Sequence, residues 1–330
     1  MFRKLTIFGI LLALFVIILG AYVRLSDAGL GCPDWPGCYG SLIVDDTPQG
    51  INMAAESYPE RPLEASKAWK EMIHRYFASG LGFVIIMLTY FAWKRPELGQ
   101  RGLTFSLLIL VMFQGALGMW TVTLLVKPVI VMGHLLGGLA TLSLLLLLLL
   151  RLSGKRLVVV EGKRRVKVLA QVGLIVLVMQ IALGGWTSTN YAALACPELP
   201  TCFDGSWTPD VDYKEGFVLW RGLGVDYEYG VLSNQARAAI HWVHRVGAGV
   251  TTLLLILLAY FLLRIGAKKE FTMLLVCLLV QLTLGVLNVA FSLPLAIAVA
   301  HNAVAALLLL SMVYLNFRLA ICKQISRGKE

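Results

Sequence analysis

Residues 130–150 read IVMGHLLGGLATLSLLLLLLL, an apolar run that contains one histidine and no charged residue. A helix needs about 20 mostly apolar residues to cross a bilayer, so this run is long enough to span one. Seven more such runs occur, at about 5–25, 73–93, 102–124, 167–187, 238–263, 271–291 and 296–317. The sequence therefore predicts an all-α membrane protein with eight transmembrane helices.

The composition agrees with a lipid bilayer as the protein's surroundings. The chain has 330 residues, of which 58% are hydrophobic and 15% charged, with a mean hydropathy of +0.77. Soluble domains carry roughly 25% charged residues and disordered chains are poor in apolar ones, so both classes are excluded. The net charge of +10 does not indicate a nucleic-acid partner, because the basic residues lie between the apolar runs.

The basic residues fall mostly on one side of the predicted membrane. That side carries 19 of the 29 Lys and Arg residues and four acidic residues, whereas the other side carries 10 basic and 15 acidic residues. Lys and Arg accumulate in cytoplasmic loops. We therefore expect both termini in the cytoplasm and the long segments 26–72 and 188–237 on the outer face. The first run, preceded by MFRK, is interpreted as a retained helix rather than a cleaved signal peptide, and a prokaryotic plasma membrane is expected.

Two cysteine pairs share one spacing. CPDWPGC spans residues 32–38 and CPELPTC spans residues 196–202, both in segments expected on the outer face. An oxidising outer compartment favours the disulfides Cys32–Cys38 and Cys196–Cys202. A metal site is the alternative, but the spacing differs from the short one that zinc sites use.

The chain reads as two copies of one four-helix unit. The repeated landmarks are the cysteine motifs (offset 164), His74-Arg75 and His244-Arg245 (offset 170), and His134 and His301 (offset 167). Each unit has an even number of crossings, so both copies enter the membrane in the same direction, as in a parallel repeat about an axis along the membrane normal. We expect two pseudo-twofold-related four-helix bundles, residues 1–150 and 167–330, joined by a basic cytoplasmic linker at 151–166.

All five histidines are expected in the first turns of predicted helices, counted from the outer face: His74, His134, His241, His244 and His301. Ionisable residues within membrane helices are costly and face the bundle interior. A packing role would explain a single histidine equally well, but here each half supplies a pair from two helices at matching depth. Imidazoles that project inward from facing helices are how bundles hold cofactors.

Two imidazoles per half favour bis-histidine ligation of a haem iron. Copper or zinc would need more ligands per half, and the absence of C-x-x-C-H excludes covalent haem attachment. Four basic residues near the histidine level are candidates for contacts with anionic propionates, with headgroup anchoring as the alternative: Arg24, Arg75, Lys127 and Arg245.

The two halves differ beside the histidines. Glu71 precedes His74 by three residues and shares its helix face, whereas His241 occupies the equivalent position in the second half. A carboxylate in only one half predicts unequal roles. The N-terminal half would perform chemistry with Glu71 as an acid/base or electrostatic group, and the other half would hold a haem for electron transfer. An ion pair between Glu71 and Arg75 is the structural alternative.

The sequence resembles the haem A synthase family over essentially the whole chain, in Gly20-Ala-Tyr-Val-Arg24-Leu-Ser-x2-Gly29-Leu-x-Cys32-Pro-x-Trp-Pro-x-Cys38, Glu71-x2-His74-Arg75, His134, His244-Arg245 and His301. The resemblance implies oxidation of the C8 methyl group of haem O to the formyl group of haem A, for assembly of cytochrome c oxidase. It implies that His74 and His134 hold the substrate haem O beside an essential Glu71. It also implies that His244 and His301 ligate haem b.

Partners and competing functions follow from this resemblance. Haem O synthase is the expected source of the substrate, while the electron acceptor, a homo-oligomer and the role of His241 stay open. A b-type bis-histidine electron-transfer cytochrome is the alternative function, and the difference between Glu71 and His241 argues against its two equivalent sites. A transporter is disfavoured because the histidines gather near one face.

Overall fold

The computed structural model describes residues 1–153, 164–207 and 209–327. For residues 321–327 it describes the backbone only. Most of the predicted basic linker, including Lys155, Arg156 and Lys163, lies outside the described residues. So do the side chains of Lys323 and Arg327.

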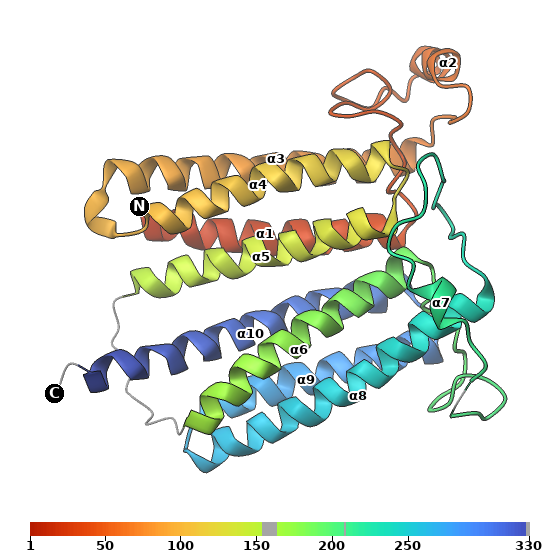
Figure 1. Cartoon of the computed structure of the whole chain (residues 1–330). Coiled ribbons are helices and arrows are strands. Elements are labelled where there is room, and N and C mark those ends of the chain that lie inside the picture. Colours follow the sequence, from red (N-terminus) through yellow and green to blue (C-terminus); the bar gives the residue numbers. More distant parts are fainter. Residues whose placement is uncertain (154–163, 208, 328–330) are drawn as a thin grey trace.

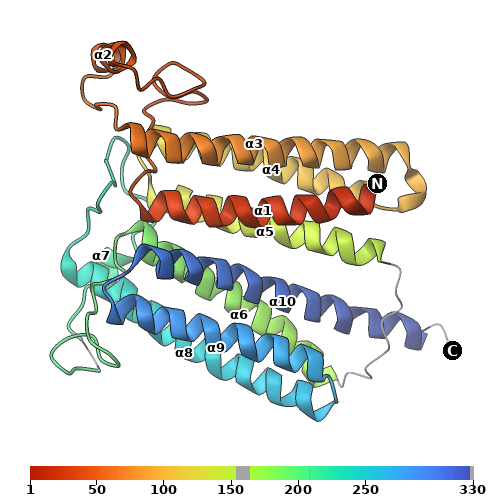
Figure 2. The same ribbon diagram turned by 180° about the vertical axis from the view of Figure 1, so that it is seen from behind.

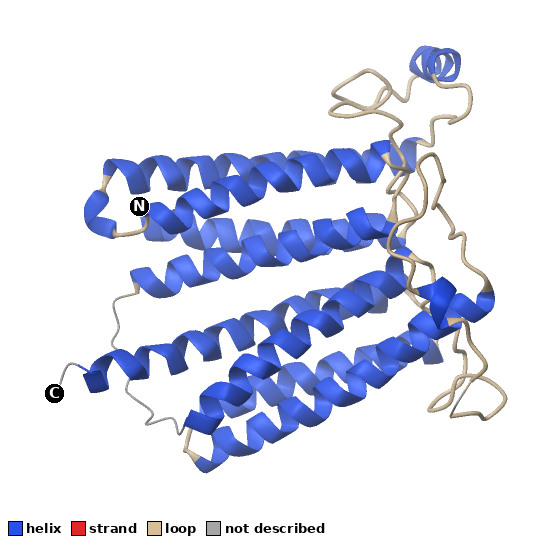
Figure 3. Cartoon of the chain, in the orientation of Figure 1, coloured by secondary structure: helices blue, strands red, loops and turns tan. Residues whose placement is uncertain are grey.

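Eight helices in the described part of the chain are long and apolar enough to cross a membrane, which confirms the eight predicted spans. They are α1 (Phe2–Leu25), α3 (Ala65–Lys94), α4 (Arg101–Thr123), α5 (Pro128–Leu152), α6 (Arg164–Thr189), α8 (Asn234–Arg264), α9 (Lys268–Ala290) and α10 (Leu295–Arg327). The remaining helices are short: α2 (Pro48–Ser57), η1 (Pro96–Leu98) and α7 (Tyr213–Gly216). No strand is found among these residues, as Figure 3 shows.

All eight long helices begin before their predicted apolar runs, and α3 and α8 do so by the most residues. α3 starts at Ala65 and α8 at Asn234, rather than at about 73 and 238. Ser233 caps α8 by accepting a hydrogen bond from the backbone N–H of Ala236, so capping rather than hydropathy sets where this helix begins. His74 and His244 consequently lie about three turns into their helices, and His134, His241 and His301 lie in the second turn of theirs. The prediction that all five histidines occupy first turns was wrong.

The long helices run alongside one another. α1, α3, α4 and α5 pack against each other, and so do α6, α8, α9 and α10, while α1, α5, α6 and α10 form the contacts between these groups. Leucine side chains with no exposed surface, such as Leu142, Leu145, Leu255 and Leu258, fill the core. The cysteine loops, α2 and α7 lie at one end of the helices, and the start of α1 and the end of α10 lie at the other (Figures 1 and 2).

The two long segments at the loop-bearing end are tied to each other. Arg61 forms ion pairs with Asp226 at 2.6 Å and Glu228 at 3.5 Å. The backbone N–H of Tyr227 donates to the carbonyl of Leu125 at 3.2 Å. These contacts hold the second long segment over the ends of helices from the first half.

Candidate functional site

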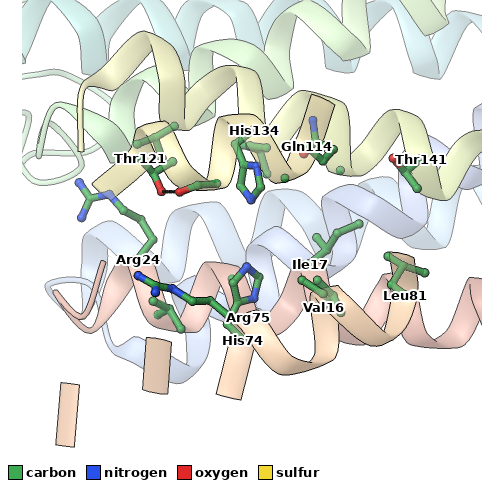
Figure 4. A pocket seen from close by; sticks show the side chains of 18 of the residues that line it. Val16, Ile17, Arg24, His74, Arg75, Leu81, Gln114, Thr121, His134 and Thr141 are labelled. Atoms are coloured by element: carbon green, nitrogen blue, oxygen red, sulfur yellow. Dashed lines mark hydrogen bonds between the residues drawn. The ribbon is translucent and has the colours of Figure 1, made fainter. Parts of the chain in front are cut away.

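A cavity of about 470 Å³ lies among α1, α3, α4 and α5. This volume is in the range of pockets that take cofactor-sized ligands. Its walls are mainly apolar, with Val16, Ile17 and Leu81 among them, and Figure 4 shows His74 and His134 facing each other across it. A bulky, mostly apolar ligand with a group that imidazole binds would suit such a cavity.

The two histidines of the cavity come from different helices, His74 from α3 and His134 from α5. Their ring centroids lie 6.5 Å apart, with the ring planes at 79°. Metal–nitrogen bonds to imidazole are about 2 Å long, so the separation leaves room for one metal ion between the rings. Nδ1 of each ring is buried without a hydrogen-bond partner. Neither ring is therefore committed to a hydrogen bond of the protein at Nδ1, as a packing histidine would be, which suits a ligand role.

Each of the four paired histidines lies against a glycine of a neighbouring helix. A Cβ atom built on the glycine would approach Cε1 of the ring to within 2.9 Å for Gly20 and His74, 3.7 Å for Gly118 and His134, 3.1 Å for Gly184 and His244, and 3.2 Å for Gly285 and His301. The missing side chain lets the ring pack close to the facing backbone. The sequence held a signal for these contacts, because the glycines repeat at the offsets of 164 and 167.

The histidines of the second half have glutamine neighbours. Nε2 of Gln180, on α6, lies 3.0 Å from Nδ1 of His244. Nε2 of Gln281, on α9, lies 3.2 Å from Nε2 of His301. Gln114, the equivalent of Gln281 in the first half, lines the cavity and its buried Nε2 has no partner. The pairing of these amides with imidazoles was not predicted from the sequence.

Glu71 and His241 perform the same structural task in the two halves. The backbone N–H of Cys32 donates to Oε2 of Glu71 at 3.0 Å, and that of Cys196 donates to Nδ1 of His241 at 3.1 Å. Both side chains are buried, at 5% and 4% exposure. His241 therefore contacts a cysteine loop, and Glu71 adds a carboxylate at the cavity wall.

The arginine that follows each of these residues ties its cysteine loop to the helix. Arg75 pairs with Glu71 at 2.5 Å and donates to the loop carbonyls of Asp34, Pro36 and Gly37. Arg245 lies 3.2 Å from Nε2 of His241 and donates to the carbonyls of Cys196, Glu198 and Thr201. Arg75 also lines the cavity.

Arg24 and Lys127 differ in where their charges lie. Arg24 lines the cavity, donates to the carbonyl of Ser188 at 2.6 Å, and keeps its buried Nε without a partner. Lys127 instead donates to the carbonyl of Gly222 at 2.7 Å, with its ammonium 3.6 Å from the ring centre of Trp220. The second long segment thus covers the charge of Lys127, and its propionate contact stays a prediction.

The predicted cysteine pairs are bonded. The sulfur atoms are 2.06 Å apart in Cys32–Cys38 and 1.94 Å apart in Cys196–Cys202. Both disulfides are almost fully buried against the first turns of the histidine-bearing helices α3 and α8. Each disulfide thus fixes the loop whose backbone N–H contacts Glu71 or His241.

Residues from the second half complete the cavity of the first. Gly185, Ser188 and Thr189 of α6 and Asn302 of α10 belong to its walls. Nothing in the sequence pattern assigned these residues to the first site, because the pattern shows equivalence between halves and not the contacts between them.

Residues 3–313 match the model of a family described as cytochrome oxidase assembly protein. The chain belongs to this family. It is 48% identical over 306 residues to a protein named heme A synthase from Shewanella oneidensis, covering 92% of each chain. It is 27% identical to a heme A synthase from Rhizorhabdus wittichii, covering 91% of this chain and 88% of that protein. Membership of the cytochrome oxidase assembly family and the eight apolar helices make this an integral membrane protein.

Proposed function

We propose that this protein is a haem A synthase, which oxidises the C8 methyl group of haem O to a formyl group. The observation that carries the proposal is the pair of facing imidazoles, His74 and His134, in a largely apolar cavity. The 48% identity to a protein named heme A synthase supports it independently. The competing electron-transfer function would give the carboxylate at this cavity wall no task beyond anchoring its cysteine loop.

The residues around the cavity have distinct roles in this proposal. His74 and His134 bind the iron of the substrate and fix the plane of the porphyrin. Arg24 and Arg75 lie toward one end of the cavity, where their positive charges suit the propionates (Figure 4). The unpartnered Nε of Arg24 is a donor that such a carboxylate would satisfy.

Glu71 is the acid/base residue of the proposed reaction. Conversion of a methyl to a formyl group removes protons as well as electrons, so a carboxylate at the cavity wall has a direct use. The ion pair with Arg75 and the hydrogen bond from Cys32 orient the carboxylate. Its structural role as an anchor of the cysteine loop and its chemical role are therefore compatible.

The second pair, His244 and His301, would ligate haem b. Each ring packs closely against a glycine, as the rings of the first pair do. Haem b, when bound, would supply one-electron transfer, and these two histidines would hold it in the half that adjoins the substrate site.

The proposed architecture is two pseudo-twofold-related bundles, residues 1–150 and 167–330. Equivalent positions meet between the halves, which supports a twofold relation. Arg24 donates to the carbonyl of Ser188, and the hydroxyl of Tyr191 bonds to Asp27 at 3.0 Å, each across an interval of 164 residues. The contacts of α1 with α10 and of α6 with α5 are equivalent in the same way.

The charge pattern supports an orientation with both termini in the cytoplasm and the cysteine loops outside, in a prokaryotic plasma membrane. Haem O then reaches the cavity within the membrane, with haem O synthase as its proposed source. The same membrane would hold the electron acceptor and any further copies of this chain.

Pigment extraction from the purified protein tests the proposed function. The protein is produced with haem O synthase, and its haems are separated by chromatography. Haem A or its alcohol precursor is the expected product beside haem b. Haem b alone would support the electron-transfer cytochrome, and the absence of any haem would support transport; either result overturns haem A synthesis.

A further inference from the structure

The cavity of the first half extends well beyond the space between its two histidines. It follows α1 from Arg24 to Ala13, about 16 Å of helix length. Figure 4 shows Arg24 and Arg75 toward one end of the cavity and Leu81 and Thr141 toward the other. A porphyrin whose propionates meet the two arginines therefore turns its opposite edge toward the end of the cavity that Leu81 lines.

Gln114 lies on the side of that opposite edge. It belongs to α4, one turn before Gly118, the glycine against His134, and so lies about 6 Å further from the cysteine loops than Gly118 does. Gln114 lines the cavity, is only 8% exposed, and has at Nε2 no hydrogen-bond partner among the described residues. The hydroxyl of Thr141, by contrast, donates to the carbonyl of Gly137 at 2.9 Å. Since buried polar groups are normally hydrogen-bonded, the amide of Gln114 is available to a ligand.

Gly137, on α5, gives this amide its space. A Cβ atom at Gly137 would collide with Nε2 of Gln114. In the second half the offset of 167 places Gln281 opposite Gln114. The same offset places Val304, with its branched side chain, opposite Gly137. Nε2 of Gln281 lies 3.2 Å from Nε2 of His301. The equivalent amide of the second half is thus paired with an imidazole, so the two glutamines are not in the same state.

Haem O differs from haem b on the edge opposite the propionates, where a hydroxyl-bearing isoprenoid chain replaces one vinyl group. A hydroxyl group both donates and accepts hydrogen bonds, so it pairs with either end of an amide. A vinyl group forms no such bond. An amide beside this edge therefore distinguishes the two haems, and the apolar walls beyond it, with Leu81 and Ala13, suit the isoprenoid chain.

We propose that Gln114 binds the hydroxyl group of haem O and thereby makes the first half select haem O over haem b. This inference rests on the proposed function, because it takes haem O as the substrate. Gln114 acts in recognition and not in the oxidation. The C8 methyl group shares its pyrrole ring with a propionate, so the same orientation turns this methyl group toward the end of the cavity where Glu71 pairs with Arg75.

Equilibrium binding tests this proposal. Wild-type protein and Gln114→Leu are produced without haem O synthase, and each is titrated with haem O and with haem b while absorbance is recorded. Leucine has nearly the size of glutamine and no hydrogen-bonding group. The ratio of haem O to haem b affinity should therefore fall about tenfold, the effect of one hydrogen bond. The isoprenoid chain is the same in both proteins and cancels from this comparison. An unchanged ratio would overturn the proposal.

Two further variants serve as control and as second test. Gln281→Leu removes the glutamine that contacts His301 and should keep the wild-type ratio; a fall equal to that of Gln114→Leu would contradict a specific role of Gln114. Gly137→Val keeps the amide but fills its space, so the ratio should fall here too. This variant does not depend on the folding of Gln114→Leu, and a wild-type ratio from it counts against the proposal.

Haematohaem separates the hydroxyl group from the isoprenoid chain, because it carries hydroxyethyl groups in place of both vinyl groups of haem b and has no such chain. The preference for haematohaem over haem b should be about tenfold greater in the wild-type protein than in Gln114→Leu. Equal preferences would refute recognition of the hydroxyl group. These titrations require no turnover. If the wild-type protein binds haem O but never forms haem A, the proposed function fails, while the affinity ratios still decide the role of Gln114.

Discussion

The two cysteine loops are anchored by the same geometry with different chemistry. In one half the backbone N–H of the first cysteine meets a carboxylate, Glu71, and in the other it meets an imidazole, His241. In both halves the arginine one turn further on contacts that anchor. Anchoring a cysteine loop therefore does not require a carboxylate. A requirement for Glu71 beyond anchoring must therefore come from the cavity that it lines.

Replacing one histidine at a time has the largest expected effect and tests whether the halves hold different porphyrins. His74→Ala and His134→Ala should abolish haem A formation and leave the haem b spectrum in place. His244→Ala and His301→Ala should remove the haem b spectrum. Absorbance and extracted haem content measure both. Loss of haem b in His74→Ala with its retention in His244→Ala would reverse the assignment of the two halves.

Exchanging Glu71 and His241, the side chains that anchor the two cysteine loops, separates loop anchoring from a role in the oxidation of haem O. Glu71→His installs the anchor that the second half uses, so the protein should fold and bind haem O. Haem A yield should fall by about 10²- to 10⁴-fold, the usual contribution of a general acid or base. His241→Glu is the matched control and should retain haem b. A wild-type yield from Glu71→His, measured by haem extraction, would show that Glu71 is an anchor only.

Removing each disulfide in turn tests what it contributes to its own cysteine loop, and the expected effects are smaller. Each bond closes a short loop, with a sequence separation of 6, so its loss should reduce the free energy of unfolding by about 2 kcal/mol. Cys32→Ser with Cys38→Ser should also lower haem A yield several-fold, because Cys32 orients Glu71. The corresponding variant of Cys196 and Cys202 should show the thermal destabilisation alone. Equal loss of haem A in both variants would mean that the disulfides act only through stability.

The smallest expected effect is a pH dependence of the second cysteine loop. Hydrogen bonds from the backbone N–H of Gly205 and from the hydroxyl of Thr201 hold the pKa of Glu198 below its usual 4.5. Because the pKa is lowered in the folded loop, this carboxylate stabilises the loop above about pH 4.5, and the contribution is lost as the pH falls through the lowered pKa. Amide exchange at Asp204 and Gly205 should therefore quicken in acid relative to Glu198→Gln at the same pH. Identical pH profiles for the two proteins would refute the coupling.

Much of this site was predictable because the long apolar runs of membrane helices, and the polar residues that interrupt them, are recognisable in the sequence. The eight spans, the cysteine pairs and the histidine pair of the cavity follow from apolar length, spacing and repeat offsets. Helix starts were predicted less well, since α3 continues through polar residues outside its apolar run. The contacts of Lys127 were not predicted, because nothing near it along the chain indicated that Gly222 and Trp220 would cover it.

The amino-acid sequence alone predicts a membrane protein of eight helices with motifs repeated in its two halves, because burial in lipid demands continuous apolar runs and a sequence repeat shows as near-constant offsets. Which groups meet in space depends on the tertiary structure: Arg24 of the first half meets the carbonyl of Ser188 in the second, and Gln180 meets His244 within the second half. Such contacts depend on how helices rotate and cross, which packing sets and hydropathy does not record.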